Sequence, residues 1–163
     1  MDYFRQALAA VKDLKRDGVV TEYAIGGGMA ASFWSEPTAT FDLDVFVLLP
    51  SDQPLVSLSE IYKWARTHGY REEAEHILIA GVPVQFIPAH NALAEEAVTT
   101  AADLDYDGES IRVICPEYLI AMSLEPSART PKRMARVGLL LEGTVDRHLL
   151  NDILKRYSLN LPE

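Results

Sequence analysis

The chain begins with hydrophobic positions at helical spacing and then changes to the shorter period of strands. Phe4, Leu8 and Val11 recur at this spacing and predict an N-terminal helix that ends at Gly18. The later run over residues 41–49 is continuously apolar in its second half, so this strand is expected at the centre of a sheet. The complete set of predicted elements comprises helices over 2–17, 29–34, 57–68, 91–101, 116–124, 131 to about 143 and a last helix capped by Thr144, and strands over 19–25, 41–49, 75–80, 82–87, 103–106 and 110–113.

Residues with known roles at helix ends and turns support several of these boundaries. Asn91 and Thr130 are expected to cap their helices, and a proline follows Thr130. The segment 57–60 has the form of a capping box, and Asp107-Gly108 predicts a tight hairpin turn. The order of elements predicts an α+β fold, with a mixed β-sheet flanked by helices and a helical C-terminal third. We expect one domain over 1–163, with a core over about 1–114 and a helical part over about 115–157.

Composition narrows the class of protein. The 163 residues are 48% hydrophobic and 24% charged, which suits one soluble domain with a sizeable core. No apolar run approaches the ~20 residues of a membrane span and the N-terminus lacks a signal core, so a cytoplasmic protein without a membrane partner is expected. Cys115 is the single cysteine, which argues against disulfides. His76 and His90 are not spaced as a metal site with each other, so both are expected as surface or satisfied polar residues.

The net charge of −9 argues against non-specific binding to nucleic acid, which relies on Lys and Arg. Basic residues nevertheless outnumber acidic ones between Arg129 and Arg156. Two interpretations stay open. This segment forms a basic face that meets a polyphosphate or an RNA end, or it is a solvated surface paired with the acidic middle of the same or a neighbouring chain.

Candidate chemistry concentrates in the stretch from Tyr23 to Leu49. Asp42 and Asp44 stand two positions apart in a predicted strand, so both carboxylates project from one face. Carboxylates on one face repel each other unless a cation or a proton lies between them, and such oxygen ligands suit Mg²⁺. The pair is therefore a candidate magnesium site, with a solvated pair at a strand end as the alternative.

Three glycines precede this pair, at the end of the first predicted strand. Because glycine has no Cβ, a ligand can approach the backbone of Gly26, Gly27 and Gly28 closely. The N-terminus of the helix that follows offers free N–H groups to a phosphate. The stretch thus predicts a phosphate cradle beside a metal clamp, as phosphoryl or nucleotidyl transfer requires, unless the glycines form only a tight turn.

The motifs GGGMA at 26–30 and TFDLDV at 40–45 resemble the DNA polymerase beta-like nucleotidyltransferase superfamily. More narrowly, they resemble its small bacterial branch that includes the abortive-infection type IV (AbiEii-like) toxins. The resemblance implies a nucleotidyltransferase-type fold, Mg²⁺ bound by catalytic Asp42 and Asp44, and a nucleoside triphosphate bound by the glycines and oriented by Thr40. It also implies transfer of a nucleoside monophosphate to a hydroxyl on an RNA end, a protein or a small molecule. A homodimer or an antitoxin partner would suit this toxin–antitoxin branch.

Several positions depart from the family pattern. The stretch GVPVQFIP resembles the strand that bears the family's third carboxylate, but Gln85 is a neutral amide there and cannot serve as a charged metal ligand or a general base. Thr38, Ser123 and Arg133 also differ from residues that the branch often carries, whereas Lys132 matches a basic position. Lys132 and Arg133 are expected to neutralise phosphate charge. The sequence leaves open an active transferase, a nucleotide- or partner-binding member without activity, and an unrelated interaction domain.

Overall fold

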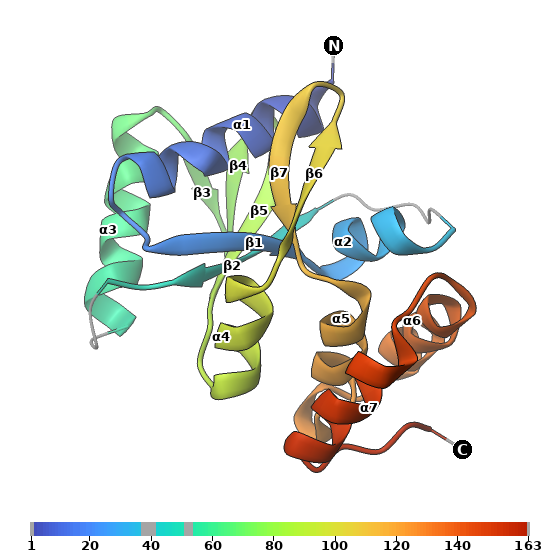
Figure 1. Cartoon of the computed structure of the whole chain (residues 1–163). Coiled ribbons are helices and arrows are strands. Elements are labelled where there is room, and N and C mark those ends of the chain that lie inside the picture. Colours follow the sequence, from blue (N-terminus) through green and yellow to red (C-terminus); the bar gives the residue numbers. More distant parts are fainter. Residues whose placement is uncertain (1, 37–41, 51–53, 163) are drawn as a thin grey trace.

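The computed structural model of the chain describes residues 2–36, 42–50 and 54–162 (Figure 1). Its elements are, in order, α1 (Tyr3–Arg16), β1 (Glu22–Gly26), α2 (Gly27–Trp34), β2 (Leu43–Leu48), α3 (Pro54–Thr67), β3 (Arg71–Glu73), β4 (His76–Ile79), β5 (Val82–Pro88), α4 (Ala92–Thr99), β6 (Ala102–Tyr106), β7 (Glu109–Val113), α5 (Pro116–Ser123), a 3₁₀ turn η1 (Pro126–Ala128), α6 (Pro131–Glu142) and α7 (Arg147–Arg156). Within the described residues, the strands form one seven-stranded mixed sheet in the order β3-β4-β5-β2-β1-β7-β6. The predicted α+β class, with a mixed sheet and a helical C-terminal third, is confirmed.

Strand β2 lies at the centre of this sheet, as its apolar sequence predicts. It pairs antiparallel with β1 and parallel with β5. Leu43, Val45 and Val47 are buried, whereas Asp44 and Phe46, which project from the other face, are only partly buried. The strand is therefore fixed in the core by one face and presents a carboxylate on the other.

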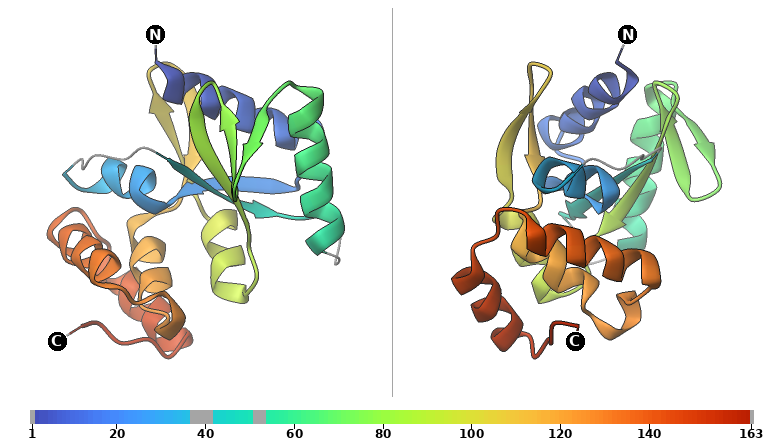
Figure 2. Two further views of the ribbon diagram at one scale, coloured as in Figure 1. Left: turned by 180° about the vertical axis from the view of Figure 1, so that it is seen from behind. Right: turned by 90° about the vertical axis from the view of Figure 1, so that its right-hand side faces the viewer.

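Helices cover both sides of the sheet. Figures 1 and 2 show α1 on one side, and α4 with the three C-terminal helices on the other. Helix α1 buries Leu8, Val11 and Leu14, which share one face, and Asp2 caps it by accepting a hydrogen bond from the backbone N–H of Arg5. Helix α5 is buried along most of its length and contacts α4, α6 and α7. No helix in the described part of the chain is long and apolar enough to cross a membrane.

Two helix starts differ from the predicted ones. Helix α3 begins at Pro54, ahead of the capping box predicted at 57–60. Proline suits the first turn of a helix because the N–H that it lacks needs no partner there. Helix α7 is capped by Asp146, whose Oδ1 accepts a hydrogen bond of 3.0 Å from the N–H of Leu149, so the prediction of Thr144 as its cap is wrong. Both residue types are good caps, and only the path of the chain decides between them.

Strand β3 lies outside every predicted element. Its residues, Arg71, Glu72 and Glu73, are all exposed, so no alternation of apolar and polar positions marks it. It forms one edge of the sheet and pairs with β4 through a turn in which Ala74 has φ of 56°. Charged side chains on an edge strand hinder pairing with other chains, which fits this position.

Candidate active site

The polar residues of the candidate site stand in one row across the sheet. Asp44 of β2 pairs with Gly26 of β1 on one side and with Gln85 of β5 on the other. Continuing the β4–β5 register by one residue places His76 level with Gln85. Residues level with one another on neighbouring strands project to the same face, and Asp42 precedes Asp44 by two positions. Gln85 therefore projects to the same face of the sheet as Asp44.

The two carboxylates lie in different surroundings. Burial raises the pKa of Asp44, and the neighbouring charge of Asp42 raises it further, while Arg136 and other cations act in the opposite direction. Asp42 lies just before β2, and its side chain is 55% exposed. An ionised Asp44 is thus disfavoured by its surroundings, and a bound cation would relieve that penalty.

This donor set fits Mg²⁺ only in part. Within the described residues, no three His, Cys, Asp or Glu side chains are grouped so as to hold a metal ion by themselves. Proteins commonly bind Mg²⁺ through one or two carboxylates, with phosphate oxygens and water as the remaining ligands. Asp42 and Asp44 match that partial arrangement.

The glycines form a direct junction between strand and helix, since β1 ends at Gly26 and α2 begins at Gly27. Gly27 has φ of 61°, which favours glycine, and a Cβ on it would lie 2.9 Å from Cγ of Asp44. A Cβ on Gly26 would lie 2.5 Å from Cε2 of Phe46. Gly28 lies in the first turn of α2. The glycines at 26 and 27 are therefore required by the close approach of this junction to β2.

A cleft of about 260 Å³ opens in front of Asp44. Gly27 lines it beside the carboxylate, and Arg133 and Arg136 of α6 contribute positive charge. Between these polar groups the wall is largely apolar, formed among others by Phe46, Leu119 and Met122. The cleft thus joins the glycine junction, one Asp of the pair and two guanidinium groups. The predicted site residue Thr40, and Thr38 before it, lie outside the described residues.

Two of the basic residues of α6 line the cleft, and a third does not. Arg133 and Arg136 are three residues apart, so they lie on the same face of the helix. Arg136 is half-buried, and this burial lowers the pKa of its guanidinium, against the opposing effect of Asp44. Lys132 is exposed and is not among the residues that line the cleft. Arg136 was not predicted in the site from the sequence, although its spacing from Arg133 was an available signal.

Two other basic residues of the C-terminal segment, Arg156 and Arg129, make contacts within the fold. Both terminal nitrogens of Arg156 donate hydrogen bonds to Glu96, at 2.9 and 2.7 Å, and Arg129 donates to the backbone carbonyls of Leu124 and Asn160. At Arg156 the basic segment therefore pairs with the acidic middle of the same chain. Fewer basic residues are therefore left to bind a polyphosphate or an RNA end than the charge pattern between Arg129 and Arg156 predicted.

Of the two histidines, His76 departs from expectation and His90 does not. Nε2 of His76 is buried and, among the described residues, has no hydrogen-bond partner. It lies 3.7 Å from Oδ2 of Asp42. The prediction of His76 as a surface or satisfied residue is therefore wrong, whereas His90 is exposed and lines the cleft. The strands predicted over 75–80 and 82–87 leave only Gly81 between them, and a hairpin turn at Ala80-Gly81 places His76 opposite Gln85, which was the missed signal.

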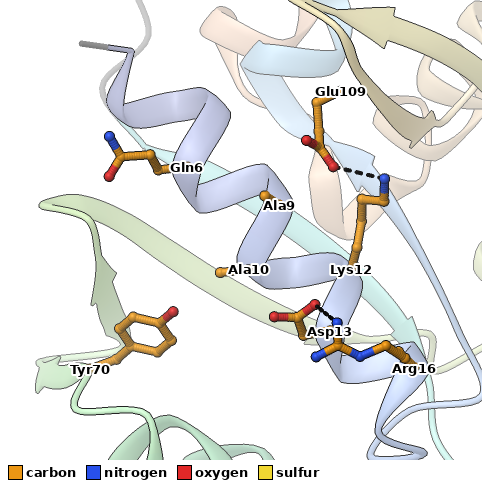
Figure 3. Close-up of a pocket in the computed structure, with 8 residues that line it drawn as sticks. All are labelled: Gln6, Ala9, Ala10, Lys12, Asp13, Arg16, Tyr70 and Glu109. Carbon is orange, nitrogen blue, oxygen red and sulfur yellow. Dashed lines mark hydrogen bonds and ion pairs between the residues drawn. The ribbon is translucent and has the colours of Figure 1, made fainter.

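A larger hollow of about 510 Å³ lies elsewhere, between α1, Tyr70 and Glu109 (Figure 3). Its charged groups pair with one another. Nζ of Lys12 lies 2.8 Å from the Glu109 carboxylate, and Arg16 lies 3.0 Å from Asp13. These pairs leave little charge to recognise a ligand. The cleft beside β2 is the candidate active site because of its chemistry and not its size.

Solved structures with a similar fold include nucleotidyltransferases and a nucleotidyltransferase-like protein. The fold matches the crystal structure of ANT(2'')-Ia in complex with adenylyl-2''-tobramycin, with a TM-score of 0.53 and 15% identity over 96% of this chain and 98% of that one. It also matches a nucleotidyltransferase-like protein from Paracoccidioides brasiliensis, with a TM-score of 0.56 and 13% identity over 94% of this chain and 86% of that one. The solution structure of the antibiotic-resistance factor ANT(2'')-Ia gives a TM-score of 0.51 and 16% identity over 97% and 93%.

No family model and no curated protein matches the sequence. At these identities the likeness to solved structures shows the fold, so the chain has a nucleotidyltransferase fold. The particular resemblance to the AbiEii-like branch finds no support among these structures.

Proposed function

We propose that this protein is a Mg²⁺-dependent nucleotidyltransferase that moves a nucleoside monophosphate from a nucleoside triphosphate to a hydroxyl acceptor. The observation that carries the proposal is the position of Asp44 in a cleft that also holds the Gly27 junction and two arginines. Asp42 stands two residues before Asp44 in the sequence. A cation site next to groups that bind polyphosphate is the arrangement that nucleotidyl transfer requires.

Each part of the site has a role in this proposal. Asp42 and Asp44 would hold Mg²⁺, which when bound supplies positive charge to the phosphates and activates the attacking hydroxyl. Gly27 leaves room for a phosphate at the N-terminus of α2, where the first N–H groups have no partner within the helix. Arg133 and Arg136 would neutralise phosphate oxygens from α6.

The apolar wall of the cleft suits the nucleoside. Phe46, Leu119 and Met122 offer a hydrophobic surface against which a base or a ribose can pack. The acceptor remains to be identified among an RNA end, a protein and a small molecule. The structural neighbour ANT(2'')-Ia was solved in complex with adenylyl-2''-tobramycin, so tobramycin belongs among the small molecules to assay.

Gln85 favours a second candidate function, a nucleotide- or partner-binding protein of the same fold without transferase activity. This neutral amide pairs with Asp44 across the sheet, at the place where the sequence resemblance implies a third carboxylate. A cytoplasmic location, a homodimer and an antitoxin partner in a toxin–antitoxin system remain predictions.

Binding is tested by thermal unfolding with Mg²⁺ and each of the four common ribonucleoside triphosphates. A ligand that binds the native state raises the melting temperature. The rise should be present in the wild type, absent in Asp44→Asn and retained in Asp103→Asn, an exposed carboxylate at 74% exposure. An equal rise in Asp44→Asn would refute the proposed metal site.

Transfer is tested with α-³²P-labelled triphosphates and three kinds of acceptor, namely bulk RNA, cell protein and tobramycin. Label that moves to an acceptor with the wild type, and not with Asp44→Asn, identifies an enzyme. Triphosphate binding without transfer to any of the three would favour the second candidate function.

A further inference from the structure

We propose that Glu125 selects guanine as the base at the end of the cleft that lies away from Asp44. The nucleotide of the proposed reaction is then GTP. This inference rests on the proposed nucleotidyltransferase function, because it takes the triphosphate to lie at the Asp44 end.

The first polar end of the cleft contains Asp44. The charges of Arg133 and Arg136 act on this carboxyl and lower its pKa against the effect of burial, so both arginines belong to the same end. Their guanidinium groups and the Gly27 junction suit phosphate oxygens. The phosphates of a bound nucleotide therefore lie at this end.

The second polar end lies further along the strands. Strand β5 runs parallel to β2, and Pro88 comes three residues after Gln85, the partner of Asp44, which is about 10 Å further along the sheet. His90 follows Pro88 and lines the cleft. This separation is comparable to the length of a nucleoside, so a base whose phosphates lie beside Asp44 reaches the second end.

Glu125 lines the cleft at this second end and is held there by Asn91. The Asn91 side chain caps α4 by accepting a hydrogen bond from the N–H of Ala94, and its Nδ2 donates a hydrogen bond of 3.0 Å to Oε2 of Glu125. No ion pair among the described residues includes Glu125. An uncompensated carboxylate opposes a polyphosphate, so its place in this cleft is explained by donors on another part of the ligand.

The chemistry of the bases identifies those donors. An ionised carboxylate only accepts hydrogen bonds, and its two oxygens have room for further donors beside Asn91. Guanine presents two adjacent donors, N1–H and the 2-amino group. Adenine and cytosine place an unprotonated ring nitrogen beside the amino group, and uracil has one N–H between two carbonyls. Guanine is thus the common base that can donate to both oxygens of Glu125.

His90 extends the match to a third atom of the base. Its Nε2 lies 3.4 Å from Nδ2 of Asn91, whose amide is oriented by its capping bond, so Nε2 accepts and the neutral ring carries its proton on Nδ1. Such an N–H suits O6 of guanine, the acceptor next to N1–H. The second end therefore offers acceptors and a donor in the order that this base requires.

The wall between the two ends also favours a base. Phe46 and Ile87, which are level in the sheet, line it together with Leu119 and Met122 of α5. A flat heterocycle packs well on such a surface, whereas an acceptor that bears ammonium groups would lose its hydration there. Glu125 is accordingly assigned to the base and not to a cationic acceptor.

Calorimetry with Mg²⁺ and five triphosphates provides the test. The wild type should bind GTP roughly tenfold or more tightly than ATP, CTP and UTP. Inosine triphosphate, whose base differs from guanine only by lacking the 2-amino group, should bind roughly tenfold more weakly than GTP. Glu125→Gln should lose the preference for GTP and keep its affinity for ATP, because glutamine still accepts from Asn91 but has one acceptor oxygen. Glu60→Gln, which changes an exposed carboxylate on α3, should keep the preference.

The outcomes separate this inference from the proposed function. Equal affinities for GTP and inosine triphosphate, or an unchanged preference in Glu125→Gln, overturn the selection of guanine. An equal loss of all triphosphates in Glu125→Gln also overturns it, because the residue would then act on the shape of the cleft. If Glu125→Gln impairs only transfer to tobramycin, which carries amino groups, the carboxylate faces the acceptor and the assignment is wrong.

The metal site is judged by a different variant. If Asp44→Asn abolishes triphosphate binding while the wild type does not distinguish the bases, the proposed function stands without the choice of guanine. If Asp44→Asn binds GTP as tightly and as selectively as the wild type, the base selection stands and the proposed metal site fails.

Discussion

The close approach of Gly27 to Asp44 makes a single methyl group a sharp probe of the site. In Gly27→Ala the new Cβ would collide with the Asp44 carboxylate, so either that carboxylate rotates away or the junction between β1 and α2 moves. Both responses displace the proposed metal ligand. A matched control is Gly18→Ala, because Gly18 also has positive φ, 75°, but a Cβ there would meet nothing within 4 Å.

The expected magnitudes follow from these two environments. The left-handed backbone costs alanine about 1–2 kcal/mol, of which about 0.4–1 kcal/mol is offset through the unfolded state. Gly18→Ala should therefore lower the melting temperature by only about 2–4 °C. Gly27→Ala carries the same backbone penalty, and steric overlap adds about 1–3 kcal/mol to it. This added cost is smaller if the Asp44 carboxylate can rotate away.

The decisive measurement is the stabilisation by ligand. A triphosphate with Mg²⁺ at a hundred times its dissociation constant adds about 2.7 kcal/mol, or roughly 5–11 °C for a chain of this size. Gly18→Ala should retain this rise and Gly27→Ala should lose it. A full rise in Gly27→Ala would refute the view that the carboxylate beside the junction binds the metal and its phosphate.

Three further predictions concern charges. Arg136→Gln should weaken binding of the Mg²⁺–triphosphate complex by roughly ten- to a hundredfold in calorimetry, whereas Lys132→Gln, outside the cleft, should not. Asp44→Asn should unfold at a higher temperature than the wild type without ligand, because burial and the charge of its neighbour raise the pKa of Asp44 and so disfavour its ionised form; a lower melting temperature would contradict this. Hydrogen bonds from Arg156 in particular lower the pKa of Glu96 from 4.5 to about 2, so this stabilisation is complete above pH 4.5 and is lost as the pH falls towards 2. The difference in melting temperature between wild type and Glu96→Gln should therefore become smaller as the pH falls from about 5 to about 3. A difference that stays constant over this range would disprove the stabilising role of the ionised Glu96 carboxylate.

Much of the architecture is already present in short stretches of sequence. The central place of β2 follows from its apolar run, and Asn91 and Thr130 cap their helices as predicted, with side chains that accept hydrogen bonds from backbone N–H groups. The Asp107-Gly108 turn has positive φ at both residues, 49° and 85°. Such features depend on a few consecutive residues, so the sequence alone determines them. The same holds for the likeness of the glycine and Asp motifs to a nucleotidyltransferase fold.

The composition of the site was decided by tertiary structure. Arg136 reaches the cleft because packing turns one face of α6 towards β2. His76 comes within 3.7 Å of Asp42 because β4 pairs with β5, which in turn pairs with β2. The charged edge strand β3 is stable only through its pairing with β4. These placements depend on which distant segments become neighbours, and local periodicity carries no information about that. The chain therefore encodes its elements locally, while the set of side chains that line the cleft is fixed only when sheet order and helix packing bring them together.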